Sequence, residues 1–184
     1  MSGSLPPGST VFVRKLARKR HWGSPDQSVQ ERTSEILANV FLNDKCPYSL
    51  YRVSSEADLD RVALALNAGR GSLSEECYFV FFTSAEFQDA NITLEQTEGR
   101  TPCHYANFLH FDADAAELQL QSLVNQALTD GRDLVRRSRP QMKQVAEQAT
   151  ETRCLAAVPA STACETEGCP QAGSQSQPLP SPAP

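Results

Sequence analysis

A cysteine, two histidines and two aspartates fall within one stretch of the chain, RTPCHYANFLHFDADAAE at residues 100–117. Such side chains bind transition metals or move protons in active sites. Residues 103–111 read as a strand, so Cys103 and His104 would point to opposite faces of a sheet. His104 and His110 would then lie roughly 20 Å apart, whereas each ligand of a zinc ion lies about 2 Å from the metal. The pattern therefore predicts no metal site.

His110 and Asp112 lie two residues apart at the end of this predicted strand. A carboxylate that orients an imidazole can make it a general base, so these two residues are the candidate catalytic or ligand-binding pair. The competing interpretation is structural. Asp112 and Asp114 come just before a predicted helix, whose first turn needs hydrogen-bond acceptors and negative charge. We favour this capping role for the two aspartates.

No complete catalytic motif accompanies the pair. The chain holds no GxSxG, HExxH or Walker A sequence, and its six cysteines form no CxxC. We therefore expect no cofactor and favour a non-catalytic protein. The longest apolar run, CYFVFF at 77–82, is far shorter than the roughly 18 residues of a membrane span, and the first residues do not resemble a secretory signal. These features predict a cytoplasmic protein without membrane insertion.

The formal charge of -5 conceals a separation of basic and acidic segments. Residues 1–22 carry five Lys or Arg and no acid, whereas residues 23–131 carry six bases against 17 acids. Residues 132–153 are basic again, with six bases against three acids. The sequence therefore predicts an acidic body with two basic flanks, and such flanks are typical of proteins that bind an acidic partner or a polyanion.

Two basic segments within these flanks supply the candidate contact residues. The first, VRKLARKRHW at 13–22, combines cations with Trp22, whose ring is suited to stacking on a base of a nucleic acid. In the second, RDLVRRSRPQMK at 132–143, cations recur at intervals of three and four, as on one face of a helix. The predicted partner-binding residues are Arg14, Lys15, Arg18, Lys19, Arg20, Trp22, Arg136 and Arg137.

The elements that must position these residues follow from hydrophobic periodicity and capping signals. Strands are predicted at 10–16, 48–53 and 77–82, with a hairpin formed by 92–96 and 103–111. Helices are predicted at 29–42 behind the capping box SVQE, after Ser55, after Asp114, and over 132–150 with a division at Pro140. This order predicts an α+β (mixed α/β) fold with a mixed sheet of four to five strands, a β-hairpin and three to four packed helices.

The predicted organisation is a single domain at residues 10–150. Residues 1–9 and the Pro/Ser/Gln-rich tail at 151–184 bury too little apolar surface to offset the entropy of ordering, so both are predicted to be disordered.

Three functional hypotheses remain open on this evidence. The leading one is an accessory or regulatory protein that docks a protein partner through its basic segments. The second is an RNA- or DNA-binding protein that uses the same cations together with Trp22. The third is a small enzyme or ligand-binding protein with its site at His110 and Asp112. The sequence identifies neither the partner nor the oligomeric state.

Overall fold

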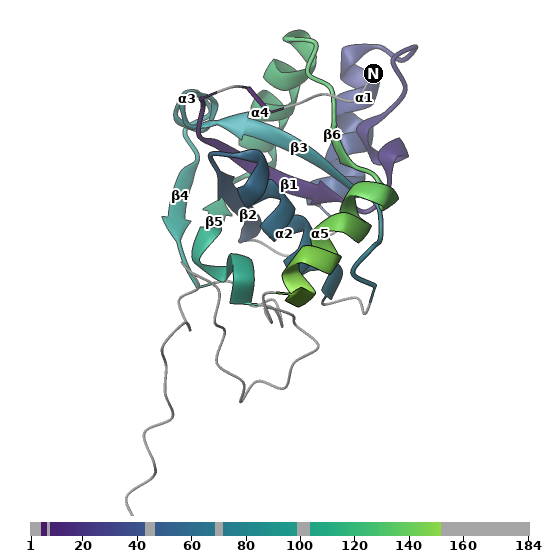
Figure 1. The fold of residues 1–184 in the computed structure, drawn as a ribbon. Helices are drawn as coiled ribbons and strands as arrows, with labels where there is room; N and C mark the ends of the chain where they lie inside the picture. Colours follow the sequence, from purple (N-terminus) through teal and green to yellow (C-terminus); the bar gives the residue numbers. More distant parts are fainter. Residues whose placement is uncertain (1–4, 7, 43–46, 69–71, 99–103, 152–184) are drawn as a thin grey trace, which may run out of the picture.

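The computed structural model of the chain describes residues 5–6, 8–42, 47–68, 72–98 and 104–151 (Figure 1). These ranges cover most of the predicted domain. Of the segments predicted to be disordered, residues 1–4, 7 and 152–184 lie outside the described ranges.

A six-stranded sheet runs through the centre of the fold (Figure 1). Its strands are β1 (Val11–Leu16), β2 (Tyr48–Val53), β3 (Cys77–Thr83), β4 (Thr93–Gln96), β5 (His110–Asp114) and β6 (Val135–Arg137). They lie in the order β4-β5-β2-β1-β3-β6, and every neighbouring pair is antiparallel. The predicted α+β class is confirmed, with six strands instead of four or five and antiparallel pairings instead of mixed ones. The strand β6 escaped prediction because three residues are too few to show an alternating pattern.

Helical elements cover both faces of the sheet. The first face, here the α4 face, packs against η1 (Lys19–Trp22), α1 (Val29–Ile36), η2 (Leu37–Phe41), α3 (Ser84–Asp89) and α4 (Glu117–Thr129). The second face, here the α2 face, packs against α2 (Glu56–Ala68), η3 (His104–Leu109) and α5 (Arg139–Glu151). Because strand side chains alternate, Phe12 and Leu16 enter the core of the α4 face, whereas Val11 and Val13 enter that of the α2 face.

Predicted capping signals lie where helices begin. The hydroxyl of Ser28 accepts a hydrogen bond from the backbone amide of Glu31 at 3.3 Å. The Glu31 carboxylate accepts one from the backbone amide of Ser28 at 2.9 Å. The predicted capping box of α1 is therefore confirmed. Thr83 and Glu86 form a second box at α3. Pro140 lies in the first turn of α5, as predicted, where its missing amide proton costs no helical hydrogen bond.

Two predicted elements differ in the structure. Residues 104–109 form the 3-10 helix η3 instead of the first part of a strand, and β4 pairs with residues 110–114. The distance argument for His104 on a strand therefore does not apply, and Cys103 lies outside the described residues. The predicted helix over 132–150 begins only at α5, because residues before it form β6. The cations of the second basic segment therefore do not share one helix face.

Candidate functional site

His110 lies in β5 and belongs to a polar cluster with Thr97, Asp112 and Tyr51. Its Nδ1 lies 2.8 Å from the Thr97 hydroxyl, which donates to one Asp112 carboxylate oxygen at 3.1 Å. The Nε2 of His110 lies 3.7 Å from the other Asp112 oxygen, and the ring packs edge-on against Tyr51. The structure therefore brings His110 and Asp112 together, as their spacing on one strand requires.

The hydrogen bonds around Thr97 assign the tautomer of the imidazole. A hydroxyl carries one proton, and Thr97 donates it to Asp112. His110 must therefore present Nδ1–H to the Thr97 oxygen. The Nε2 side of the ring faces the other oxygen of Asp112. With 6% of His110 exposed, the imidazole is enclosed within the fold.

The Tyr51 hydroxyl does not act as an acid in this cluster at neutral pH. Burial, and after it the negative charge of Asp112, raises the pKa of Tyr51 to about 12. Tyr51 therefore remains neutral, and its ring forms part of the apolar enclosure of His110.

A surface depression of about 680 Å³ adjoins the cluster, with Asp112 in its wall. Glu95 lies opposite Asp112 in the β4–β5 register, and Asp114 lies opposite Thr93; all four residues line the depression. Carboxylates directly opposite one another repel. Among the described residues, no group of three His, Cys, Asp or Glu side chains is arranged to hold a metal ion. The depression is therefore an acidic surface feature beside a buried polar cluster.

The predicted capping role of Asp112 and Asp114 is wrong. Both residues lie in β5, and α4 begins beyond them. The N-cap of α4 is Ala116, whose backbone amide donates to the side chain of Gln119 at 2.7 Å. A polar residue three positions into the helix therefore supplies the acceptor that the aspartates were expected to supply.

Arg14, in the first basic segment, is buried with 6% of its surface exposed. Its Nε and Nη2 donate to the carbonyl of Val40 at 3.0 and 2.7 Å, and its Nη1 donates to the carbonyl of Ser49 at 3.0 Å. The guanidinium also lies over the rings of Phe41 and Tyr48. Arg14 therefore supplies donors to buried carbonyls and is not presented to a partner in this conformation.

Lys15 is half-buried and makes a contact within the fold. Its Nζ donates to the side-chain oxygen of Asn67 at 2.7 Å, and the thiol of Cys77 donates to the same oxygen at 3.1 Å. Burial raises the pKa of Cys77, which keeps the thiol protonated at neutral pH. Lys15 therefore ties β1 to α2.

Trp22 is buried, with 3% of its surface exposed, and fixes η1 on the α4 face. Its Nε1 donates to the carbonyl of Arg132 at 3.3 Å, and its own carbonyl accepts a hydrogen bond from Arg32 at 3.3 Å. Gly23 follows with a φ of 74°, a conformation that favours glycine. The predicted stacking of Trp22 on a base is incompatible with this conformation, because the ring lies in the core.

Three consecutive cations, Arg18, Lys19 and Arg20, are exposed on the turn that Trp22 anchors. We refer to them as the η1 cations. Their side chains make no hydrogen bond or ion pair with any residue that the structure describes. They therefore extend into solvent from a turn whose backbone is fixed.

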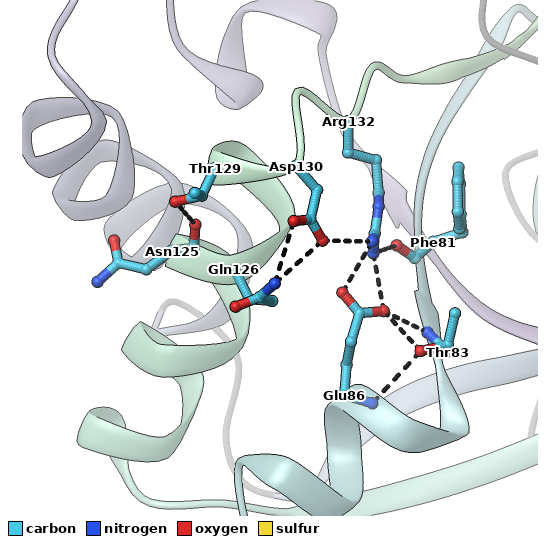
Figure 2. Close-up of polar contacts among 8 residues, drawn as sticks. All are labelled: Phe81, Thr83, Glu86, Asn125, Gln126, Thr129, Asp130 and Arg132. Atoms are coloured by element: carbon cyan, nitrogen blue, oxygen red, sulfur yellow. Dashed lines mark hydrogen bonds and ion pairs between the residues drawn. The ribbon is translucent and has the colours of Figure 1, made fainter.

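Arg132, in the second basic segment, forms an enclosed ion pair (Figure 2). Its Nη2 lies 2.8 Å from an oxygen of Glu86, and its Nη1 donates to the carbonyl of Phe81 at 2.8 Å. Only 10% of each charged side chain is exposed. Figure 2 shows the Glu86 carboxylate between Arg132 and Thr83, where it also closes the capping box of α3. The pair therefore links α3 and β3 to the segment between α4 and β6.

The two neighbouring arginines of β6 are paired differently. Arg137 is 7% exposed at its side chain, and it binds Asp60 at 2.5 Å and also Glu56. Arg136 is 46% exposed at its side chain, and its Nε lies 2.6 Å from one oxygen of Glu76. Arg137 is thus enclosed on the α2 face, whereas Arg136 remains at the surface.

The strand register brings the two basic segments to one end of the sheet. Leu16, the last residue of β1, lies opposite Tyr78, and Tyr78 lies opposite Arg136. The pKa of Glu76 is lowered first by a hydrogen bond from Tyr78 and also by the charges of Arg136 and Arg139, so Arg139 adjoins this row. We refer to five residues at this end as the basic surface: Arg18, Lys19, Arg20, Arg136 and Arg139.

No protein-family model, no curated protein and no solved structure matches this chain. Within the described part of the chain, none of the helices has the length and apolar character needed to cross a membrane.

Two residues of this site were missed in the sequence. Glu76 and Tyr78 reach Arg136 only through the pairing of β3 with β6, across 60 positions of sequence for Glu76. The available signal was an acidic residue directly before a buried strand, as in SEECYFVFF. That signal is common on protein surfaces and does not indicate which cation the acid meets.

Proposed function

We propose that this protein is an accessory protein that docks an acidic segment of a protein partner through its basic surface. The observation that carries the proposal is a contrast between two kinds of cation. Arg14, Arg132 and Arg137 are enclosed by acceptors of the fold, whereas the η1 cations are exposed and have no acceptor among the described residues. Adjacent cations of this kind create a positive potential that attracts carboxylates.

The anchoring of η1 supports this role. Because Trp22 packs in the core and bonds to the Arg132 carbonyl, a partner does not have to order the backbone of η1 on binding. An exposed ion pair contributes only about 0.2–1 kcal/mol, since long side chains lose rotamer freedom and water screens the charges. Several cations on one fixed turn act together, and they also accelerate the encounter with an anionic partner.

A nucleic acid fits this surface less well than an acidic protein segment. Proteins that bind single strands use exposed aromatic rings as stacking platforms. Trp22 is buried, and the exposed large hydrophobic side chains that the structure describes are Val29, Leu42 and Leu118, none of which is aromatic. Residues 23–131 also carry 17 acids against six bases, and this excess repels an extended phosphate backbone.

An enzyme centred on His110 has less support. The two ring nitrogens face Thr97 and Asp112 of the same cluster, and the imidazole is enclosed. The depression beside it is lined by Asp112 but contains neither His110 nor Thr97 in its wall. A general base must reach the proton that it removes, and in the described part of the chain only 6% of His110 is exposed to a substrate.

The test is the binding of a fluorescein-labelled oligo-glutamate peptide, followed by fluorescence anisotropy at low and moderate salt. R18Q/K19Q/R20Q removes three positive charges from η1. We expect this variant to bind about tenfold more weakly than wild type, from three exposed pairs of roughly half a kcal/mol each.

A matched control separates a local surface from overall charge. Q88E/L118E/Q144E changes the net charge by the same amount at exposed positions on α3, α4 and α5. We expect this control to bind the peptide nearly as well as wild type. Equal weakening in both variants would show that the peptide responds to net charge alone, and would contradict a docking role for the basic surface.

A further inference from the structure

The guanidinium of Arg136 is fixed at one end and open at the other. Its Nε donates to Glu76 Oε1 at 2.6 Å, while no described residue accepts a hydrogen bond from its two terminal nitrogens. The terminal nitrogens of Arg14, Arg132 and Arg137 donate to acceptors within the fold. Arg136 therefore differs from the enclosed arginines in having donors available, and from the η1 cations in having a fixed orientation.

The group that fixes Arg136 is itself held in place. The Tyr78 hydroxyl donates to the same oxygen of Glu76 at 2.6 Å. This hydrogen bond is the main cause of the lowered pKa of Glu76, so the carboxylate stays ionised at neutral pH. The same bond raises the pKa of Tyr78, so the hydroxyl remains a donor. Tyr78 and Arg136 are direct partners in the β3–β6 register, so the sheet brings both residues beside Glu76, which bonds to each of them.

We propose that the two terminal nitrogens of Arg136 bind one carboxylate of the docked acidic segment, with Glu76 and Tyr78 as positioning residues. The inference rests on the proposed function. It assigns to Arg136 the contact in which the basic surface recognises the planar geometry of a carboxylate. Parallel N–H donors of a guanidinium match the two oxygens of a carboxylate, whereas a lysine ammonium acts as a point charge. Because Glu76 holds Arg136 before binding, less rotamer freedom is lost on docking.

The experiment measures binding of the oligo-glutamate peptide to R136K, R136Q and R20K. R136K retains the charge but removes the parallel donors, so we expect R136K and R136Q each to bind about tenfold more weakly than wild type. R20K is the matched control, because Arg20 has no described partner that orients it, and its affinity should stay within about twofold. Wild-type affinity in R136K would overturn the inference.

The positioning role of Tyr78 is tested by a double-mutant cycle. Y78F removes the donor to Glu76 without changing any charge, and we expect about threefold weaker peptide binding than wild type. In the R136Q background the same change should have no further effect, because the orientation of Arg136 is then irrelevant. Equal losses in both backgrounds would indicate a merely structural role for Tyr78. Circular dichroism and thermal melting verify that each variant is folded.

The variants distinguish the docking function from the role of Arg136, and an oligonucleotide distinguishes a carboxylate from a phosphate as the bound anion. If R18Q/K19Q/R20Q binds the peptide as wild type does, the proposed docking function fails. If that variant is weakened but R136K is not, only the role of Arg136 fails. A single-stranded oligonucleotide of equal charge is expected to bind more weakly than the peptide and to be insensitive to R136K. Tighter oligonucleotide binding that R136K abolishes would assign the site to phosphate and contradict the carboxylate.

Discussion

The indole of Trp22 donates a hydrogen bond to the backbone carbonyl of Arg132 at 3.3 Å, and so joins the two basic segments across 110 positions of sequence. The side chain of Arg132 is bonded to Glu86 and to the carbonyl of Phe81 (Figure 2). One residue thus anchors η1 through its backbone and β3 through its side chain. Arg132 therefore links η1 to β3, the strand that pairs with β6 and so with Arg136.

Trp22 is the single tryptophan of the chain, so its fluorescence reports its own surroundings. Because only 3% of Trp22 is exposed, we expect a blue-shifted emission in the native protein and weak quenching by acrylamide. Unfolding in urea should shift the emission to the red and increase quenching. A native protein quenched as strongly as the unfolded chain would contradict the anchoring of η1.

Arg14 is expected to matter for stability and not for docking. R14M removes the donors to the carbonyls of Val40 and Ser49, and a buried acceptor left without a donor costs about 1–3 kcal/mol. We expect urea denaturation to show a loss of this size, while the folded variant binds the oligo-glutamate peptide with unchanged affinity. Weaker peptide binding without a loss of stability would place Arg14 in the contact surface instead.

The ion pair between Glu86 and Arg132 gives a third prediction. E86A removes the carboxylate that pairs with Arg132 and caps α3, leaving Arg132 with Asp130 at 3.5 Å, and breaking a buried pair in this way costs about 3–5 kcal/mol. Q88A changes an exposed residue of the same helix and should cost less than about 0.5 kcal/mol. Denaturant midpoints of the two variants provide the comparison. Similar midpoints for both would show that the pair contributes little.

The central strands and the start of α1 were predictable from the sequence, because each follows from a pattern among neighbouring residues. The strands at 11–16, 48–53 and 77–83 lie where alternation and aromatic content predict them, and the capping box at 28–31 marks the start of α1. The strand prediction failed at residues 104–109, where the buried apolar residues Ala106 and Leu109 lie three positions apart, as the backbone of the 3-10 helix η3 requires. The correct predictions rest on patterns within a few neighbouring residues, which the sequence displays directly.

The division of the cations into enclosed and exposed ones was not predictable from the sequence. Arg14 finds its acceptors at Val40 and Ser49, and Arg137 finds its acids on α2, so each depends on contacts between distant segments. The sequence around Trp22, a tryptophan beside several cations, is the same whether the ring is buried in the core or exposed for stacking on a base. Sequence alone therefore located the basic segments but not which of their residues face solvent.

Tyr51 should give the protein a distinctive response to alkaline pH. Its pKa is raised from 10.0 to about 12, so between these values the unfolded chain loses a proton that the native protein keeps. The contribution of Tyr51 to stability is fully present below pH 10 and is lost as the pH approaches 12, a change of about 2–3 kcal/mol.

Two measurements test this prediction for Tyr51. In wild type, the tyrosinate absorbance should show one group that ionises near pH 12, and this group should be missing in Y51F. The fall in the free energy of unfolding between pH 10 and 12 should also be smaller in Y51F than in wild type. Identical absorbance titrations of the two proteins would show that Tyr51 is not the buried group.

The most direct test of the central claim is to map peptide binding residue by residue. Backbone amide signals of isotope-labelled protein would be followed by NMR during titration with the oligo-glutamate peptide. We predict that the largest shifts fall on Arg18 to Trp22 and on residues 136–139, and that R18Q/K19Q/R20Q needs about tenfold more peptide to reach the same shifts. Shifts centred elsewhere in the described chain, or shifts that appear in that variant at the same peptide concentrations as in wild type, would contradict docking through the basic surface.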